Sequence, residues 1–205
     1  MNRNENNTLD DILSAAKAEF SEKGFQSASL RRIVKNAGVT TGAFYGYFKR
    51  KEELFDALVG EQYDMLMGMF CETQNAFTRL SPKEQVQQMD ELSGEGMKKM
   101  MDYCYANKDE FKLILCSSDG AKYENIIHDM AEIEVDATHK FAKTMEQLGY
   151  TKYNVDKTLE HILASGLFSA FFEVIIHDIP HENAAEYLEE LKAFYTAGWK
   201  KIMGF

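Results

Sequence analysis

Hydrophobic residues recur three and four positions apart along most of the chain, which is the spacing of an amphipathic α-helix. The first such pattern begins at Thr8, a helix-capping residue, and ends at Gly24. A second, short pattern follows Ser29 and a third follows Thr40, with a tight turn expected at Gly38 between them. Three short helices joined by a glycine turn are typical of a helix-turn-helix unit.

Longer helical patterns fill the rest of the chain. With only 2 prolines and 13 glycines in 205 residues, little of the sequence is suited to turns, and the fold class expected is all-α. Gly94 and Gly96 are expected to weaken the middle of one of these helices. The long helices are predicted from about Lys51 and then over about Pro82–Tyr105, Lys108–Cys116, Tyr123–Leu148, Val155–His177 and Glu182–Met203.

Charge is distributed unevenly between the two parts of the chain. The net charge of -10 and the pI of about 5.0 argue, as averages, against a nucleic-acid partner. Residues 1–52, however, carry a net charge of +3 and residues 53–205 carry -13, and no acidic residue occurs from Lys23 through Lys51. Most charge runs are simply solvated faces, but this one coincides with the helix-turn-helix pattern and so favours a phosphate-facing surface.

The start of the third helix carries groups suited to DNA. Thr40 and Thr41 offer hydroxyl and backbone donors, and the small side chains that follow them would allow close approach to base edges. Lys51 opposes the dipole of its own helix, which is explained if both face a phosphate. Tyr45 and Tyr47 are either core residues or phosphate contacts through their hydroxyls.

Three successive stretches within about residues 8–58 resemble the N-terminal domain of the tetracycline-repressor (TetR) family. Residues 12–25 contain ILSAA, a later Phe and EKGF, which look like the family's first helix. Residues 29–39 contain SLRRIV and AGV, similar to its second helix and turn. Residues 40–54, TTGAFYGYFKRKEEL, resemble its recognition helix and the start of its connecting helix, while Ala28 and Gly46 depart from the residues common there.

This resemblance implies a homodimer that binds a pseudo-palindromic double-stranded DNA operator and a small-molecule effector. Residues 1–52 would form the helix-turn-helix DNA-binding domain, and residues 53–205 a helical effector-binding and dimerisation domain. Effector binding would tilt the fourth helix and change the separation of the two recognition helices. The residues expected at the DNA are Ser29, Arg31, Thr40, Thr41, Gly42, Ala43, Tyr45, Tyr47 and Lys51.

The segment 159–176 is apolar on almost every side, so it must be covered by more than one neighbour. One cover can be the core of its own chain and the other a second subunit, although a monomer could hide the whole segment. Ser165, Ser169 and Glu173 interrupt the segment, and no membrane span is expected. The residues predicted at a dimer interface are Leu163, Gly166, Leu167, Ala170, Phe171, Val174, Leu191, Tyr195 and Trp199.

Methionines are concentrated between residues 65 and 101, with aromatic residues nearby. Such a group usually fills a core, and the alternative is an adaptable apolar pocket, in which Gly94 and Gly96 would form a flexible wall. A pocket would bind a small, largely apolar effector. Its predicted lining residues are Met65, Met69, Phe70, Met97, Met101, Tyr103 and Phe111.

Signatures of catalysis or of a cofactor are missing from the sequence, which has no phosphate-cradling glycine loop, GxSxG or HExxH motif. His128, Glu132, Asp136 and His139 share a helix face and could bind a metal, but the opposite face is apolar, so the simpler interpretation is a solvated face. The three cysteines form no CxxC pair. We therefore expect no enzyme, no cofactor and no metal.

The sequence favours a cytoplasmic, ligand-responsive transcriptional regulator, most simply a repressor released from its operator by the effector. The polar N-terminus lacks the apolar region of a secretory signal, in agreement with the cytoplasm. Two alternatives remain at this point. One is a helical enzyme or carrier with a vestigial helix-turn-helix, and the other is an interaction protein whose basic patch binds an acidic protein.

Overall fold

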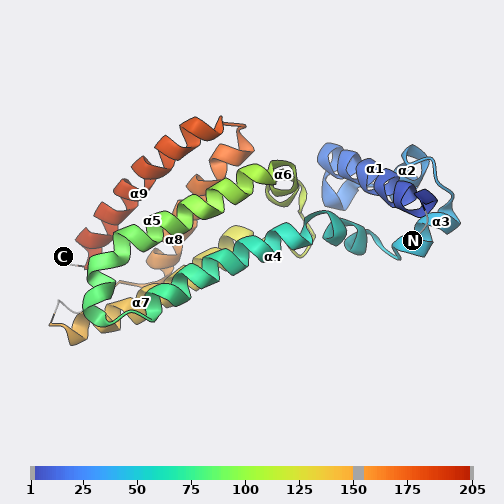
Figure 1. The fold of residues 1–205 in the computed structure, drawn as a ribbon. Helices are drawn as coiled ribbons and strands as arrows, with labels where there is room; N and C mark the ends of the chain where they lie inside the picture. Colours follow the sequence, from blue (N-terminus) through green and yellow to red (C-terminus); the bar gives the residue numbers. More distant parts are fainter. Residues whose placement is uncertain (1–2, 150–154, 204–205) are drawn as a thin grey trace. The chain divides into compact units, whose positions relative to one another are not determined.

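The computed structural model describes residues 3–149 and 155–203, and every regular element in these ranges is an α-helix (Figure 1). The expected all-α fold is confirmed. The helices are α1 (Arg3–Ser27), α2 (Leu30–Asn36), α3 (Thr41–Tyr47), α4 (Lys51–Thr78), α5 (Pro82–Ala106), α6 (Lys108–Ser117), α7 (Ile126–Gln147), α8 (Lys157–Ile176) and α9 (His181–Met203).

The chain forms two compact units. The N-terminal unit contains the residues up to 65 together with 107–124, and the C-terminal unit contains residues 66–106 and those from 125 onward. The helix α4 begins in the first unit and continues into the second. The helix α6 belongs to the N-terminal unit although it lies within residues 53–205, the predicted C-terminal domain. The functional division at residue 52 stays a prediction.

Local signals set most helix ends in the N-terminal unit. Ser29 caps α2 and Thr40 caps α3, and Gly38 has a positive φ angle of 68° in the turn between them. Gly24, with a φ of 71°, kinks α1 where the sequence predicts its end, and the helix continues to Ser27. The helix start predicted at Thr8 is wrong, because α1 already begins at Arg3. Residues 3–7 contain no proline or glycine that would end a helix, so the helix extends past the expected cap.

Aromatic side chains fill the core of the N-terminal unit. Phe20 lies against Phe25 and Phe55, with ring centroids 5.9 and 4.9 Å away, and Phe44 of α3 is fully buried. Phe111 of α6 is fully buried as well. Edge-to-face and offset aromatic pairs of this kind stabilise a core beyond their buried area.

The apolar helix α8 runs through the C-terminal unit and packs against α7 and α9. Its side chains Phe168, Phe171 and Phe172 are buried, as expected for a helix covered on several sides. Among the described helices, α8 also has the length and composition of a membrane-crossing segment, with a mean hydropathy of 1.6. Core helices of soluble proteins share these properties, and the contacts of α8 with α7 and α9 bury part of its apolar surface.

The helix α5 passes through Gly94 and Gly96 without a break, so the weakening expected at these glycines does not interrupt the helix. Both lie where another helix comes close. A Cβ atom on Gly96 would lie 2.6 Å from Cγ2 of Thr73 in α4, and one on Gly94 would lie 2.4 Å from Nζ of Lys192 in α9. The glycines therefore make room for neighbouring side chains, because real Cβ contacts are longer than these distances.

Candidate DNA-binding surface and effector cavity

A buried carboxylate holds α2 in place beneath the expected DNA-binding surface. Glu19 of α1 is 2% exposed, and its Oε1 accepts a hydrogen bond from the backbone N–H of Ser29 at 3.0 Å. Its Oε2 forms an ion pair with Nε of Arg32 at 3.1 Å, while Ser29 Oγ accepts from the Arg32 amide. Glu19 therefore positions the start of α2, a role that the sequence analysis did not assign to it.

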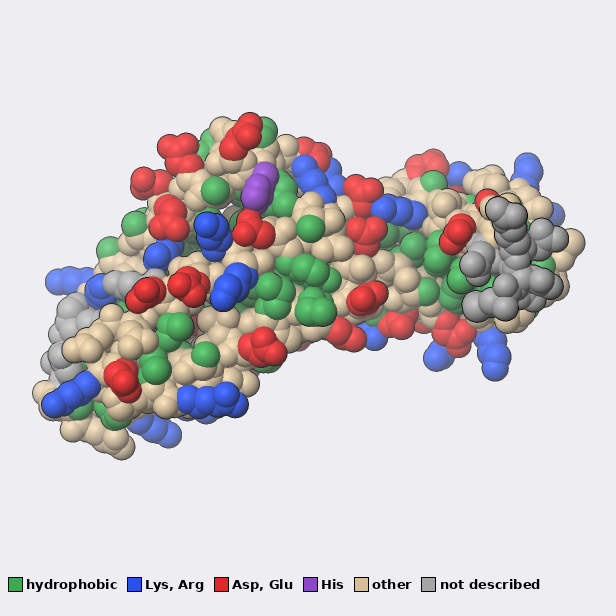
Figure 2. Space-filling model, viewed as in Figure 1, with side chains coloured by type: hydrophobic (Ala, Val, Ile, Leu, Met, Phe, Trp, Pro, Cys, Tyr) green, Lys and Arg blue, Asp and Glu red, His purple; other side chains and the backbone are tan. Residues whose placement is uncertain are grey.

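The helix α3 buries its aromatic side and exposes the residues predicted to meet DNA. Phe44 is fully buried, whereas Tyr45 and Tyr47 are 52% and 37% exposed, so neither tyrosine is a core residue. A Cβ atom on Gly42 would meet no atom within 4 Å, which leaves this part of the helix surface open. The predicted contact residues that are exposed are Arg31, Thr40, Thr41, Gly42, Ala43, Tyr45 and Tyr47. Exposed Lys and Arg side chains project from this unit, interspersed with acidic ones (Figure 2).

Lys51 has an internal role that the sequence did not reveal. Its ammonium donates to the backbone carbonyl of Gln26 at 2.9 Å and lies 4.7 Å from the ring centroid of Phe25. The lysine thus satisfies a carbonyl at the end of α1, where a cation is favourable. An ammonium has three N–H donors, so the expected phosphate contact stays a prediction beside this structural role.

Two acidic residues of α6 contact the first helix within the same unit. Nζ of Lys17 lies 2.9 Å from Oδ2 of Asp109 and 2.9 Å from Oε1 of Glu110. Partial burial lowers the pKa of Lys17, but the hydrogen bonds to Glu110 and Asp109 outweigh it, and the pKa is raised. These contacts hold the start of α6 against α1 within the N-terminal unit.

A second polar cluster joins α4 to the segment after α6. Nζ of Lys122 lies 2.6 Å from Oδ1 of Asp56, and the Tyr123 hydroxyl donates to the same oxygen. These two donors lower the pKa of Asp56, while burial and the hydrogen bond to Asp56 raise the pKa of Tyr123 to about 12. Tyr123 does not start α7 as expected, because its ring is buried against Phe55 and Tyr63 before that helix begins.

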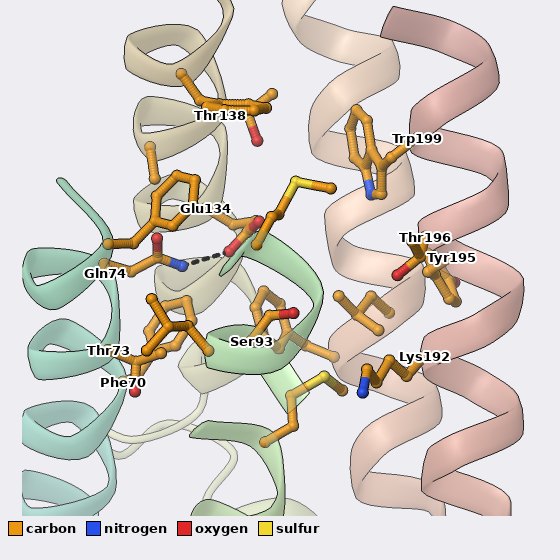
Figure 3. Close-up of a pocket in the computed structure, with 18 of the residues that line it drawn as sticks. Phe70, Thr73, Gln74, Ser93, Glu134, Thr138, Lys192, Tyr195, Thr196 and Trp199 are labelled. Carbon is orange, nitrogen blue, oxygen red and sulfur yellow. Dashed lines mark hydrogen bonds between the residues drawn. The ribbon is translucent and has the colours of Figure 1, made fainter. Parts of the chain in front are cut away.

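The C-terminal unit encloses a cavity of about 170 Å³ between α4, α5, α7, α8 and α9 (Figure 3). Its walls are mainly apolar, as in most small-molecule sites. The aromatic lining consists of Phe70, Phe77, Phe141, Phe168, Tyr195 and Trp199. The polar lining includes Thr73, Gln74, Ser93, Glu134, Thr138, Lys192 and Thr196.

A carboxyl and an ammonium group line the same cavity. Nε2 of Gln74 donates to Oε2 of Glu134 at 2.7 Å, and Figure 3 shows this bond reaching across from α4 to α7. Burial raises the pKa of Glu134, and the hydrogen bond from Gln74 offsets part of that effect. Lys192 reaches over Gly94 from α9. The sequence signal for Glu134 was a carboxyl on the otherwise apolar face of α7, one turn from Met130.

The structure brings only part of the predicted pocket together. Phe70 and Met97 line the cavity, and Met101 lines a second hollow between α8 and α9. Met69 and Tyr103 line neither. Met65 and Phe111 belong to the N-terminal unit, Met65 exposed and Phe111 in its core. The methionine-rich stretch is a poor guide because helical rotation turns its members toward different neighbours.

The predicted dimer residues lie mostly between α8 and α9 of the same chain. Leu167, Tyr195 and Trp199 line the cavity, and Ala170, Phe171, Val174 and Leu191 line the second hollow. A Cβ atom on Gly166 would lie 2.8 Å from the Tyr195 hydroxyl, while Leu163 is half-buried. The small residues of α8 therefore allow close packing with α9 inside one chain.

Other large apolar side chains on α8 and α9 are exposed. Phe194 is 72% exposed and Ile162 is 59% exposed. Exposed large apolar side chains of this kind are candidates for an interaction surface. The exposed set on these two helices comprises Leu159, Ile162, Tyr187, Phe194 and Ile202.

Comparison with known proteins gives matches in both units. Residues 12–58 match the family described as bacterial regulatory proteins, tetR family. The HTH-type transcriptional regulator UidR of Escherichia coli K12 is 38% identical over 61 residues, which are 30% of this chain and 31% of UidR. This chain thus aligns with about a third of the length of the curated relatives it matches.

Solved structures match over nearly the whole chain. A transcriptional regulator (TerR/AcrR family) from Aquifex aeolicus VF5 is 25% identical with a TM-score of 0.52, and the match covers 91% of this chain and 99% of that one. SCO3833 from Streptomyces coelicolor, a member of the TetR transcriptional regulator family, is 17% identical with a TM-score of 0.58. That match covers 90% of this chain and 88% of SCO3833, and it shows a shared fold.

Proposed function

The chain belongs to the TetR family of regulatory proteins, and we propose that it is a DNA-binding transcriptional repressor that a small molecule releases from its operator. The observation that carries this proposal is the exposed face of α3, with Tyr45 and Tyr47 pointing out of the core. A helix-turn-helix positions such a face in the major groove. As a homodimer in the cytoplasm, the protein would place two of these faces on a pseudo-palindromic site.

The cavity supports an effector with both an apolar body and a polar group. Its aromatic walls suit a hydrophobic skeleton, while Glu134 and Lys192 offer an acceptor and a cation. A volume of about 170 Å³ is below the range of roughly 300–1,000 Å³ for drug-sized sites. The effector proposed is therefore compact, and it is more polar than the largely apolar effector predicted from the sequence.

Chain connectivity offers a route from effector to DNA. The helix α5 lines the cavity through Met97 and continues through Asn107 into α6. Asp109 and Glu110 at the start of α6 contact Lys17 of α1 in the N-terminal unit. An effector that shifts α5 would alter these contacts and, through them, the first helix of the DNA-binding unit.

The exposed apolar positions of α8 and α9 support a dimer. Ile162 and Phe194 are the most exposed of these side chains, and a second copy of the chain would remove them from water. A stable interface buries about 1,600 Å² in total, which two helices from each copy can supply. We propose these outward residues as part of the interface, beside the interface residues predicted from the sequence.

Binding to duplex DNA from the region upstream of the protein's own coding sequence tests the proposal. Fluorescence anisotropy is measured over a series of salt concentrations, with a scrambled duplex of equal length as the control. We expect preference for one duplex and an affinity that falls steeply with salt. Equal binding to both duplexes, or binding to neither, would overturn the proposal and favour a vestigial helix-turn-helix or a protein-binding role.

A further inference from the structure

Two histidines and a glutamate from neighbouring helices form a cluster on the surface of the C-terminal unit. His128 and Glu132 lie one turn apart on α7, and His161 comes from α8. One potential ligand atom from each residue lies within 4.8 Å of the others. None of the three lines the effector cavity, so the cluster is a separate feature.

The two imidazoles are spaced as two ligands of one tetrahedral metal ion. Nδ1 of His128 lies 3.4 Å from Nε2 of His161, and the rings are inclined by 63°. Zinc–nitrogen bonds of about 2.0–2.1 Å in tetrahedral geometry separate two nitrogens by about 3.3–3.4 Å. As a direct N–H···N hydrogen bond, the same distance is longer than the usual range of about 2.7–3.2 Å.

Glu132 is placed to orient one of these imidazoles. Its Oε1 lies 2.9 Å from Nδ1 of His161, the ring nitrogen on the side away from His128. The two atoms are close enough for an ion pair, but Nδ1 of His161 has no aligned hydrogen-bond acceptor. A small rotation of the Glu132 side chain would let its carboxylate accept the Nδ1–H and leave the lone pair on Nε2. Ligand histidines in metal sites are commonly held by a carboxylate in this way.

We propose that His128 and His161 bind a divalent transition metal ion such as Zn²⁺, and that Glu132 orients His161 for this purpose. Nitrogen ligands favour this class of metal over Mg²⁺ or Ca²⁺, which take oxygen ligands. Two coordination positions remain for water or an anion. The ion joins α7 to α8 and therefore stabilises the folded C-terminal unit in proportion to its binding.

The sequence analysis interpreted the face with His128 and Glu132 as solvated. The third member of the cluster, His161, lies on another helix and could not be recognised from the spacing within α7. His139, which shares that face, lies instead beside the buried Glu160, with His139 Nε2 and Glu160 Oε2 2.6 Å apart. The packing of α7 on α8 thus gives the candidate residues of α7 different neighbours. His128 and Glu132 lie near His161, whereas His139 lies near Glu160.

Zinc binding to the untagged full-length protein tests the site. The protein is treated with chelator, exchanged into buffer with a phosphine reductant, and titrated with Zn²⁺ by calorimetry and by competition with a chromogenic chelator. We expect one ion per chain and a rise in melting temperature with Zn²⁺ but not with Mg²⁺. Failure to bind one ion per chain would overturn the proposal.

Substitutions identify the ligands. His128→Ala and His161→Ala should each abolish the stoichiometric binding, and Glu132→Gln should weaken it about 10- to 100-fold. His181→Ala is the matched control, because His181 Nε2 also lies beside a carboxylate, 2.8 Å from Oδ1 of Asp102. Each variant should melt like the parent without metal. Zinc binding that survives both ligand substitutions, or is lost equally in the control, would contradict the assignment.

Discussion

Nζ of Lys17 in α1 lies 2.9 Å from Oε1 of Glu110 in α6, although 93 positions separate the two residues in the chain. The contact joins α1 to α6 within the N-terminal unit, and α6 is the helix that follows the cavity-lining α5 in the chain. Asp109 makes a second ion pair with the same ammonium. Partly exposed ion pairs contribute only about 0.2–1 kcal/mol each to the free energy of unfolding, so the main role of these pairs is to hold α6 in position against α1.

Replacing Lys17 with Met should loosen α6 without unfolding the protein. We expect faster amide hydrogen exchange over residues 108–117 and a small decrease in the free energy of unfolding, about 1 kcal/mol or less. Lys23→Met is the control, because Lys23 pairs with Glu22 on its own helix. Unchanged exchange in α6, or the same change in the control, would show that the Lys17 contacts do not hold this helix.

Arg31→Ala and Tyr45→Phe should weaken operator binding while leaving the fold intact. Both residues are exposed, and the tyrosine substitution removes only the hydroxyl. If Arg31 contacts a phosphate, its replacement should reduce the slope of log K, the logarithm of the DNA association constant, against log salt concentration by about 1. Anisotropy measures both effects, with Lys143→Ala in α7 as the control. Parental affinity and salt dependence in both variants would remove these residues from the DNA interface.

Gly96→Ala should destabilise the C-terminal unit and constrict the cavity wall. The new methyl group would lie 2.6 Å from Cγ2 of Thr73, a short, branched side chain that cannot move away easily, so we expect a loss of about 1–3 kcal/mol. Gly68→Ala is the matched control in α4, because its Cβ meets nothing within 4 Å. There alanine should stabilise the helix by about 0.5–1 kcal/mol. Chemical unfolding of both variants checks the opposite signs.

Glu134→Gln should stabilise the protein increasingly as the pH rises from 4 to 8. Burial raises the pKa of Glu134 in the folded state, so the stability linked to its protonated form is complete below the unfolded pKa of about 4.3. That contribution is lost as the pH rises through the folded value, whereas glutamine stays neutral. The difference in melting temperature between variant and parent should therefore widen with pH, and a constant difference would contradict the prediction.

Asp56→Asn should have the opposite pH dependence. The hydrogen bonds from Lys122 and Tyr123 lower the pKa of Asp56, so its contribution is present above the unfolded pKa of about 3.9 and is lost as the pH falls through the folded value. The variant should melt below the parent at pH 7, and the difference should shrink toward low pH. Melting curves from pH 3 to 7 measure it, and a difference that grows on acidification would refute the assignment.

Features that depend on residues close together in the chain were predictable from the sequence. The caps at Ser29 and Thr40 and the turn at Gly38 each involve groups within a few positions, so their residue types alone indicate the structure. The burial of Phe44 in α3 follows from its spacing, whereas the sequence left open whether Tyr45 and Tyr47 lie in the core, and the structure exposes both. The family resemblance rests on these same local signals and is confirmed over residues 12–58.

Which side chains meet across helices was decided only by the tertiary structure. Gln74 and Glu134 are 60 positions apart, and His128 and His161 are 33 apart, so no local spacing brings either pair together. The inward turn of Tyr195 over Gly166 likewise depends on how closely α9 approaches α8. A helical pattern determines which residues share a face, but the rotation and separation of packed helices determine what that face contacts.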